Sequence, residues 1–431
     1  MAVTAFVVMI GFVTALLMAP WATASGKSAT LVDAFFTATS AVCVTGLTTV
    51  PTGEYWSSYG HAVILLGIKV GGMGIMTIGA LFTLVIARRL RLTQRLLAAS
   101  ETRTGLGEVR TLVRSVAVWS TAIELIVAAF LVPRFLALGE SAGAAVWHGV
   151  FYGIGAFNNA GFVPTQAGLA PFARDWLVLT PIVVGVFVGA LGHPVLVGAF
   201  RTVRHPRRWA LTTKLTVTAS LGLLVLSTVV IAAQEWSNAA TFGDLSGGTK
   251  VLDALFAATM TRSGGFATAR AGDFYPETML VAEVLMLIGG GPVSTAGGIK
   301  VTTFAVMLLA IRAEVRGDRD IEVFRRTIPA TVLRVAVTVT AAAVSFILIG
   351  AVALLEITDA PVDRIMFEVI SAFSTCGLST GLAATLPAGG KLVLTVMMLV
   401  GRLGPITLAS ALALSNRRRV IRLPEERPIV G

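Results

Sequence analysis

The sequence predicts an all-α integral membrane protein made of four tandem units, each with a membrane span, a short re-entrant helix and a second span. Two observations predict this fold. First, 55% of the 431 residues are hydrophobic and only 13% are charged, which is more apolar than a soluble core requires. Second, four polar segments, AVCVTGL, AFNNAGF, TRSGGF and AFSTCGL, carry glycines spaced 115, 104 and 112 residues apart, namely Gly46, Gly161, Gly265 and Gly377.

Eight apolar stretches are long enough to cross a membrane, because about 20 helical residues span roughly 30 Å of hydrocarbon. We expect these spans near 2–19, 61–87, 112–138, 176–200, 211–234, 277–311, 331–355 and 391–414. A weaker apolar stretch lies between the two spans of each unit and is too short to cross. The expected units are 1–95, 96–205, 206–320 and 321–415, and a basic tail follows at 416–431.

The basic residues concentrate at every second boundary between these elements. Of the 34 lysines and arginines, 23 lie at 88–114, 201–214, 312–334 and 415–431. This is the positive-inside pattern of membrane proteins, and it predicts that both termini are cytoplasmic. The net charge of +11 therefore indicates orientation, and we expect no nucleic-acid partner. The first span resembles a signal peptide before WATASG, but it lacks a basic n-region, which favours a retained span.

Each short helix is expected to begin at a similar distance before its glycine. Asp33, His148, Asp253 and Asp363 lie 12 to 14 residues before the four glycines, and we expect the aspartates to be N-caps. A helix of about ten residues is roughly 15 Å long, so it ends near mid-membrane. The backbone that follows must then be buried in protein or face water.

Four such segments around one axis would meet this requirement together, since their carbonyl oxygens could replace the water around a cation. Glycine suits the end of each segment because it readily adopts a positive φ. The sequence thus predicts a pseudo-fourfold pore with a selectivity filter. The predicted ion-binding residues are Val44, Thr45, Gly46, Asn159, Ala160, Gly161, Ser263, Gly264, Gly265, Thr375, Cys376 and Gly377.

The second spans carry a further glycine pattern, ending at Gly74, Gly192, Gly291 and Gly404, and these glycines are expected to pack against the filter segments. In the third unit the pattern extends into LMLIGGGPVSTAGGIKVTTF, which a continuous helix does not tolerate. We expect an unwound loop at 289–298 that acts as a gate, and only this one severely interrupted helix. The predicted gate residues are Gly289, Gly290, Gly291, Pro292, Ser294, Thr295, Gly297, Gly298 and the intramembrane arginine Arg402.

Taken together, the VTGL, NNAGF, SGGF and STCGL segments, the GGGPVSTAGGIK loop and the GRLGP arginine resemble the Trk/Ktr/HKT superfamily of potassium transporters over nearly the whole chain. The length is closer to the KtrB-type membrane subunit than to TrkH. The resemblance implies potassium uptake across the bacterial inner (plasma) membrane, with selectivity due to the four glycines. Plant relatives with serine at the first position tend toward sodium, so Gly46 favours potassium.

The resemblance also implies a homodimer in the lipid membrane, on a cytosolic ring of nucleotide-binding (KtrA-type) regulatory subunits. No dinucleotide-binding glycine motif follows a strand in this chain, so we expect nucleotide only on that partner and no cofactor on the chain itself. The transported substrate would be the potassium ion, held by backbone carbonyls of the filter residues. The family's gate corresponds here to Gly289–Gly298 and Arg402.

Three alternatives remain open at this stage. A sodium or sodium/potassium transporter of the same fold differs only in filter size and carbonyl field, which the sequence does not give. An alternating-access transporter would favour inverted repeats and paired broken helices, whereas these four units run in one direction. An intramembrane hydrolase is remote, because no serine–histidine spacing recurs among the 4 histidines, so we expect no enzyme.

Overall fold

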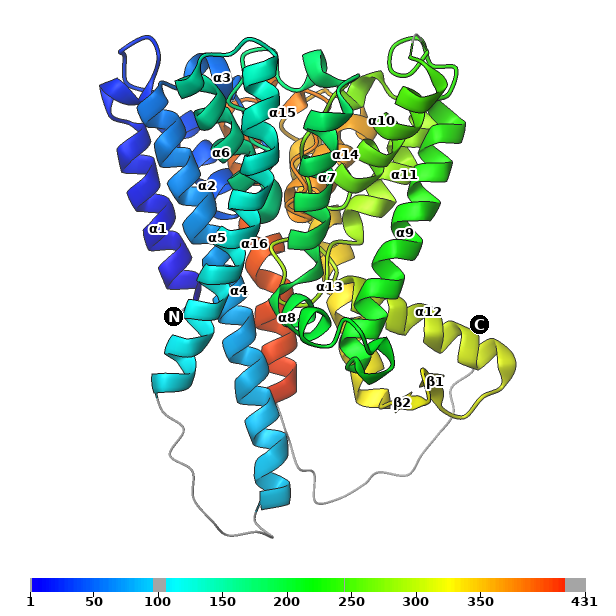
Figure 1. The fold of residues 1–431 in the computed structure, drawn as a ribbon. Helices are drawn as coiled ribbons and strands as arrows, with labels where there is room; N and C mark the ends of the chain where they lie inside the picture. Colours follow the sequence, from blue (N-terminus) through cyan, green and yellow to red (C-terminus); the bar gives the residue numbers. More distant parts are fainter. Residues whose placement is uncertain (1, 96–105, 244, 415–431) are drawn as a thin grey trace.

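The computed structural model describes residues 2–95, 106–243 and 245–414, and this part of the chain is mostly helical (Figure 1). The basic tail predicted at 416–431 lies outside the described residues. The helices of the first two predicted units are α1 (Ala2–Leu17), α2 (Leu31–Val42), α3 (Thr52–Tyr55), α4 (Ser58–Arg95), α5 (Leu106–Ala137), α6 (Ala142–Asn158), α7 (Trp176–Leu191) and α8 (His193–Arg201).

The second half of the chain repeats this order of long and short helices. Its helices are α9 (Leu211–Glu235), α10 (Gly247–Met260), α11 (Pro276–Leu287), α12 (Val301–Arg316), α13 (Ala330–Leu355), α14 (Val362–Phe373), α15 (Leu382–Thr385) and α16 (Ala388–Leu414). Four short 3-10 turns lie in the connections, at Pro20–Ala22, Ala170–Phe172, Pro206–Arg208 and Ala271–Asp273.

Several helices have the length and the apolar composition of membrane-spanning helices. Among the described residues, four helices are long and apolar enough to cross, and the number becomes five if a bent pair counts as one span. Six of the eight predicted spans are single helices, and the predicted range 277–311 is divided between α11 and α12. These helices carry many exposed large apolar side chains, which suits a surface in contact with lipid.

The expectation of one interrupted helix was wrong, because the predicted span 176–200 is also broken. Helices α7 and α8 meet at 99°, and Gly192 between them has φ +90°. Pro194 occupies the first turn of α8, where its missing N–H costs nothing. A side chain at residue 192 would overlap the backbone oxygen of Pro292, so the break brings the second unit against the third.

The short helices α2, α6, α10 and α14 form the inner layer of a closed arrangement. Each packs against the first long helix of its own unit and against a helix of the unit before it. The contacts between units run α4 to α6, α7 to α10, α11 to α14 and α16 to α2. Because the last of these joins the fourth unit to the first, the four units close into a ring.

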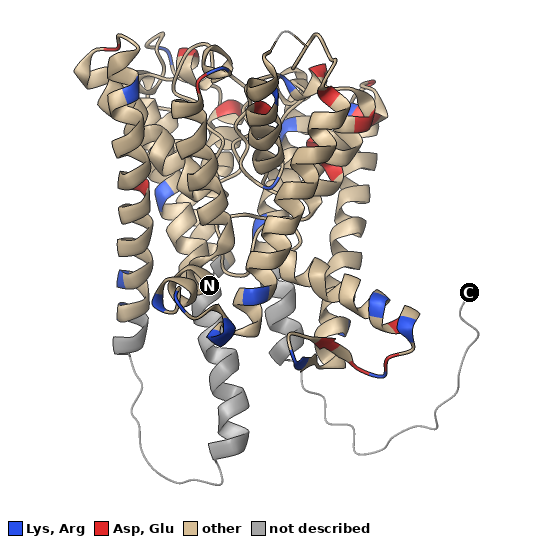
Figure 2. Ribbon diagram, turned by 45° about the vertical axis from the view of Figure 1, so that its right-hand side comes forward, with Lys and Arg blue, Asp and Glu red and all other residues tan. Residues whose placement is uncertain are grey.

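Charged residues separate between the two ends of the molecule. Most acidic residues lie at the end where α2 begins, and basic residues are frequent at the opposite end (Figure 2). At that second end a hairpin not predicted from the sequence joins α12 to α13. Strand β1 (Ile321–Val323) pairs antiparallel with β2 (Arg326–Ile328), and Phe324 and Arg325 both have positive φ, as a tight two-residue hairpin turn requires.

The aspartates expected as N-caps do not occupy that position. The cap of α2 is Thr30, whose hydroxyl accepts a hydrogen bond from the backbone N–H of Asp33 at 3.1 Å. Asp363 lies in the first turn of α14, while His148 and Asp253 lie inside α6 and α10. The helices begin earlier than the apolar runs suggested, because Thr30, Ser141 and Ser246 precede them and hydroxyl residues favour helix starts.

Candidate functional site

The four glycine-ended segments share one backbone conformation. We call residues 44–46, 159–161, 263–265 and 375–377 the first to fourth strips. In each strip the glycine has a positive φ, and so does the residue two positions before it. These pairs are Val44 and Gly46 (φ +56° and +92°), Asn159 and Gly161 (+60° and +61°), Ser263 and Gly265 (+67° and +73°), and Thr375 and Gly377 (+44° and +95°).

Such values are uncommon for residues with a side chain, so four repetitions at the same register indicate a common structural requirement. The strips are also tied to their helices in similar ways. In three of them the residue before the glycine donates its backbone N–H to the carbonyl six positions before the glycine: Thr45 to Ser40 at 2.7 Å, Ala160 to Gly155 at 2.9 Å and Cys376 to Ser371 at 2.9 Å.

The third strip differs, because both Gly264 and Gly265 donate their N–H groups to the carbonyl of Met260. Two serines add a side-chain contact that sequence reasoning missed. The N–H of Gly46 donates to the hydroxyl of Ser40 at 3.1 Å, and that of Gly377 donates to the hydroxyl of Ser371 at 3.2 Å. Their equal distance from the glycine was the signal that could have identified them.

The four strips meet one another in cyclic order. A β-carbon at Gly161 would lie 2.8 Å from the Cα of Gly265, and one at Gly265 would lie 2.5 Å from the backbone oxygen of Cys376. A β-carbon at Gly377 would overlap the backbone oxygen of Thr45, and one at Gly46 would overlap that of Ala160. Each glycine therefore faces the backbone of the next strip, and the fourth faces the first.

All twelve strip residues are buried. The two free cysteines lie at this level: Cys43 directly precedes the first strip, and the thiol of Cys376 contacts the carbonyl of Met260 at 3.3 Å. Among the described residues no group of three or more His, Cys, Asp or Glu side chains could hold a metal ion.

Residues 288–300, which we call the third-unit loop, separate α11 from α12. The loop is held by backbone hydrogen bonds rather than by helix. Gly289 donates to Ile299 and Val301 donates to Gly290, both at 2.9 Å. Gly291 donates to Ala190 of α7 at 2.7 Å, and His193 donates to Val293 at 3.3 Å. Ser294, Thr295, Gly297 and Gly298 are buried.

The third-unit loop contacts the second, third and fourth strips. The hydroxyl of Thr295 donates to the side-chain oxygen of Asn159 at 2.6 Å. The N–H of Gly297 donates to the hydroxyl of Ser263 at 3.2 Å. Ser263 in turn donates to the backbone oxygen of Ser374, next to the fourth strip, at 3.0 Å. A β-carbon at Gly297 would overlap the hydroxyl of Thr375, so the loop also lies against the fourth strip.

Arg402 of α16 reaches the same loop. Its Nη1 donates to the backbone oxygen of Thr295, and its side chain is 3% exposed. Within the described part of the chain its Nε and Nη2 have no hydrogen-bond partner. A buried guanidinium with unused donors leaves positive charge beside the loop and the strips.

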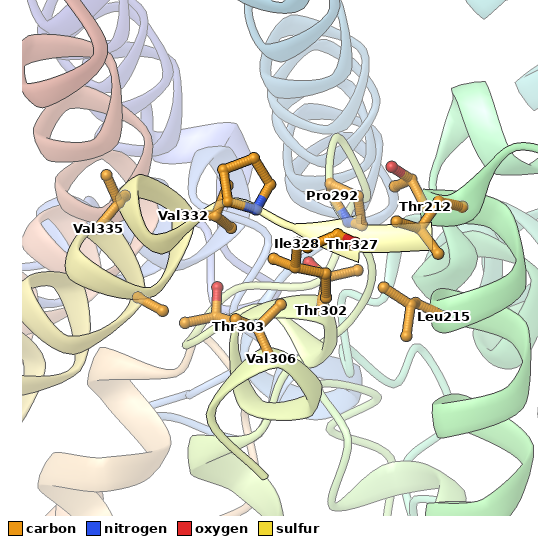
Figure 3. A pocket seen from close by; sticks show the side chains of 13 residues that line it. Thr212, Leu215, Pro292, Thr302, Thr303, Val306, Thr327, Ile328, Val332 and Val335 are labelled. Carbon is orange, nitrogen blue, oxygen red and sulfur yellow. The ribbon is translucent and has the colours of Figure 1, made fainter. Parts of the chain in front are cut away.

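Pro292 marks the side of the loop that faces a hollow. It lines a pocket of about 380 Å³ between α9, α12, β2 and α13, together with mostly apolar and threonine side chains (Figure 3). The labelled neighbours of Pro292 include Thr212 and Leu215 of α9 and Ile328 of β2. The loop therefore has packed strips on one side and open space on another.

The glycines of the second spans do pack against the short helices, but not those predicted. A β-carbon at Gly71, Gly189 or Gly401 would overlap the backbone oxygen of Val42, Phe157 or Phe373, respectively. Each of these oxygens lies four residues before a strip glycine. Gly74 and Gly404, by contrast, have ordinary space around them. In each of these three motifs the glycine that contacts the short helix is the first one, which lies three residues before the glycine that was predicted. The sequence shows this spacing of three residues in all three motifs.

A buried polar network beside the second strip was also missed. Lys69 of α4 and Glu124 of α5 form an ion pair at 2.5 Å, and the side chains are 20% and 4% exposed. Glu124 also accepts a hydrogen bond from Asn158 at 2.8 Å, and Asn158 directly precedes the strip. The sequence does not indicate this network, because its residues lie far apart along the chain. Arg262 is likewise structural and donates to the backbone of Ser220 at 2.9 Å.

Comparisons with known proteins agree with this architecture. The family model TrkH, described as cation transport protein, matches residues 2–417. Ktr system potassium uptake protein B of Bacillus subtilis (strain 168) is 34% identical over 421 residues, covering 96% of this chain and 93% of the relative. The protein of the same name from Vibrio alginolyticus is 36% identical over 427 residues, covering 96% and 91%.

A solved structure has a similar fold. The crystal structure of the potassium transporter TrkH from Vibrio parahaemolyticus superimposes with a TM-score of 0.73 over 94% of this chain and 83% of that chain. The sequence identity is 18%, so this likeness concerns the fold alone.

Proposed function

The chain belongs to the TrkH family of cation transport proteins, and on that premise we propose that it carries potassium ions into the cell through the ring of four strips. The observation that carries this proposal is the cyclic contact in which each strip glycine faces the next strip. A ring of backbone oxygens around one axis can replace the hydration shell of a cation. The potassium specificity rests on the similarity to the two B proteins, which are potassium uptake proteins.

In this proposal the filter consists of the carbonyls of the twelve strip residues, and α2, α6, α10 and α14 are re-entrant pore helices. Each pore helix ends directly before its strip. The C-terminal end of a helix carries roughly half a negative charge, so four such ends near the axis favour a cation there. The eight spans would be α1, α4, α5, α7 with α8, α9, α11 with α12, α13 and α16.

The third-unit loop and Arg402 form the proposed gate. The loop lies against three of the four strips, and the unused guanidinium donors of Arg402 add a positive barrier to cations at that point. The pocket beside Pro292 gives the loop space into which it can move. Opening would withdraw Thr295 from Asn159 and would release Arg402 from Thr295.

The orientation and partners are part of the same proposal. The basic boundaries are expected in the cytoplasm, with both termini on that side of the bacterial inner (plasma) membrane. The B proteins are named as parts of a Ktr system, which supports control by a cytosolic nucleotide-binding subunit. We further propose a homodimer embedded in lipid, with no cofactor on this chain and no enzymatic activity.

Complementation tests this function. A bacterial strain without its own potassium uptake should grow at limiting potassium when it expresses this protein, and its potassium uptake should saturate. The Gly161→Ala variant should fail, because φ is +61° and the added methyl group would lie 2.8 Å from Gly265. If the wild-type protein takes up sodium but not potassium, the proposed substrate is wrong and sodium is the transported ion.

A further inference from the structure

A hydrogen bond beyond the strip recurs in the first, second and fourth units. The chain leaves each strip glycine toward the end of the molecule where the short helices begin. Three or four residues after the glycine it carries a threonine, namely Thr49, Thr165, Thr268 and Thr380. Thr49, Thr165 and Thr380 are each hydrogen-bonded to a polar side chain of the short helix in their own unit. We call these contacts the anchor bonds.

The partners differ in chemistry but not in position. Thr49 donates to Asp33 at 2.8 Å, and Thr165 shares a hydrogen bond with the hydroxyl of Tyr152 at 2.7 Å. Asp33, Tyr152 and Glu368, the partner of Thr380, belong to α2, α6 and α14. Because three different side chains make the same contact, common ancestry of one residue does not explain it. A shared mechanical requirement does.

The anchor bond of the fourth unit is the most extensive. One oxygen of Glu368, Oε1, accepts hydrogen bonds from the hydroxyl of Ser379 at 2.5 Å, from the backbone N–H of Thr380 at 2.9 Å and from its hydroxyl at 3.2 Å. The Glu368 side chain is fully buried. Three donors converge on this one oxygen, whereas each of the other anchor bonds is a single hydrogen bond, so Glu368 holds the chain after the fourth strip most firmly.

A filter needs such support behind its carbonyls. Oxygens that line one axis repel one another, and a smaller ion would draw them inward if the strips could move. Discrimination between ions depends on the spacing and number of these oxygens. A bond from the rigid helix to the chain just outside a strip limits that movement.

We propose that the three anchor bonds are positioning contacts that set the preference for potassium over sodium, and that Glu368 contributes most. This inference rests on the proposed function. Glu368 does not touch the ion; it acts through Ser379 and Thr380. The measured quantity must therefore be ion preference rather than stability alone.

Glu235 offers a matched control. It is also a fully buried carboxylate, and it accepts hydrogen bonds from Asn238 at 2.6 Å, Thr241 at 2.7 Å and the backbone N–H of Tyr275 at 3.0 Å. These partners lie in the connections after α9 and before α11, and none belongs to a strip. Removing Glu235 costs comparable hydrogen bonding without freeing a filter segment.

The experiment compares potassium and sodium fluxes of the full-length protein in proteoliposomes. Glu368→Leu should lower the potassium-to-sodium flux ratio about tenfold, because it removes all three hydrogen bonds that hold the chain after the fourth strip. Glu368→Gln keeps an acceptor oxygen and should retain most of the preference. Glu235→Leu should reduce thermal stability but leave the ratio at its wild-type value.

The double variant Ser379→Ala, Thr380→Val provides an independent test if Glu368→Leu does not fold. It removes two donors and keeps the backbone contact, so the ratio should fall about threefold. A wild-type ratio in this double variant would overturn the inference, as would an equal loss of preference in Glu235→Leu. A wild-type protein that moves no potassium would instead refute the proposed function.

Discussion

The hydroxyl of Thr295 donates a hydrogen bond to the side-chain oxygen of Asn159 across 2.6 Å, which joins the third-unit loop to the second strip. The same threonine accepts a hydrogen bond from Arg402 through its backbone oxygen. Asn159 is further fixed by donating to the carbonyl of Val186 in α7 at 3.2 Å. One residue of the loop is therefore held at once by the second strip and by α16 of the fourth unit. The proposed closed state depends on this double contact.

Thr295→Val should raise potassium flux. Valine has nearly the shape of threonine but cannot donate to Asn159, so the closed state loses about 1 kcal/mol, which shifts its equilibrium with the open state about fivefold. Flux through proteoliposomes measures the change. Thr338→Val is the matched control, because Thr338 on α13 bonds only the carbonyl of Arg334 in its own helix, at 2.8 Å. Equal flux in Thr295→Val and wild type would show that this contact does not hold the loop closed.

Arg402→Ala should also raise flux, and by more than Thr295→Val. The substitution removes the hydrogen bond to Thr295 and the buried positive charge that opposes cations. Arg402→Lys retains the charge but not the forked donor geometry, so its flux should lie between wild type and Arg402→Ala. Deletion within 291–297 should likewise increase flux. If flux is unchanged in both Arg402→Ala and the deletion, the loop and the arginine are architectural.

The sequence predicted those parts of the site that depend on backbone chemistry. Regularly spaced glycines indicated the strips, and Gly and Pro at high density indicated the loop between α11 and α12. It did not predict the bend at Gly192, although Pro194 two residues later was a signal for a new helix start. Lys69, Glu124 and Asn158 could not be joined from sequence, because only the packing of α4, α5 and α6 brings them together.

The anchor bonds were missed for another reason. Asp33 is one of the recurring polar residues near the start of each short helix, and the sequence predicts that it caps that helix. In the structure it accepts a hydrogen bond from Thr49 beyond the first strip. A propensity rule describes what a residue does locally, whereas these contacts span more than ten residues and require the helix and strip to be placed first.

Gly161→Ala and Gly143→Ala should have opposite consequences. At Gly161 the φ of +61° is unfavourable for alanine and the methyl group would lie 2.8 Å from the Cα of Gly265, whereas Gly143 has no atom within 4 Å of its β-carbon position. Gly143 lies in the first turn of α6, where alanine is favoured by up to about 1 kcal/mol. Potassium uptake should be abolished in the first variant and normal in the second. Normal uptake in Gly161→Ala would contradict a filter at this ring.

Lys69→Met should destabilise the protein strongly. It leaves the buried carboxylate of Glu124 without its ion-pair partner, and uncoupling a buried pair costs about 3 kcal/mol. The double variant Lys69→Met, Glu124→Gln removes both charges, while the side-chain oxygen of the glutamine can still accept from Asn158. Thermal unfolding in detergent should therefore show a large loss for the single variant and a partial recovery for the double variant. If the double variant loses even more thermal stability than Lys69→Met, Lys69 and Glu124 act independently. Their ion pair would then not be what holds Asn158 beside the second strip.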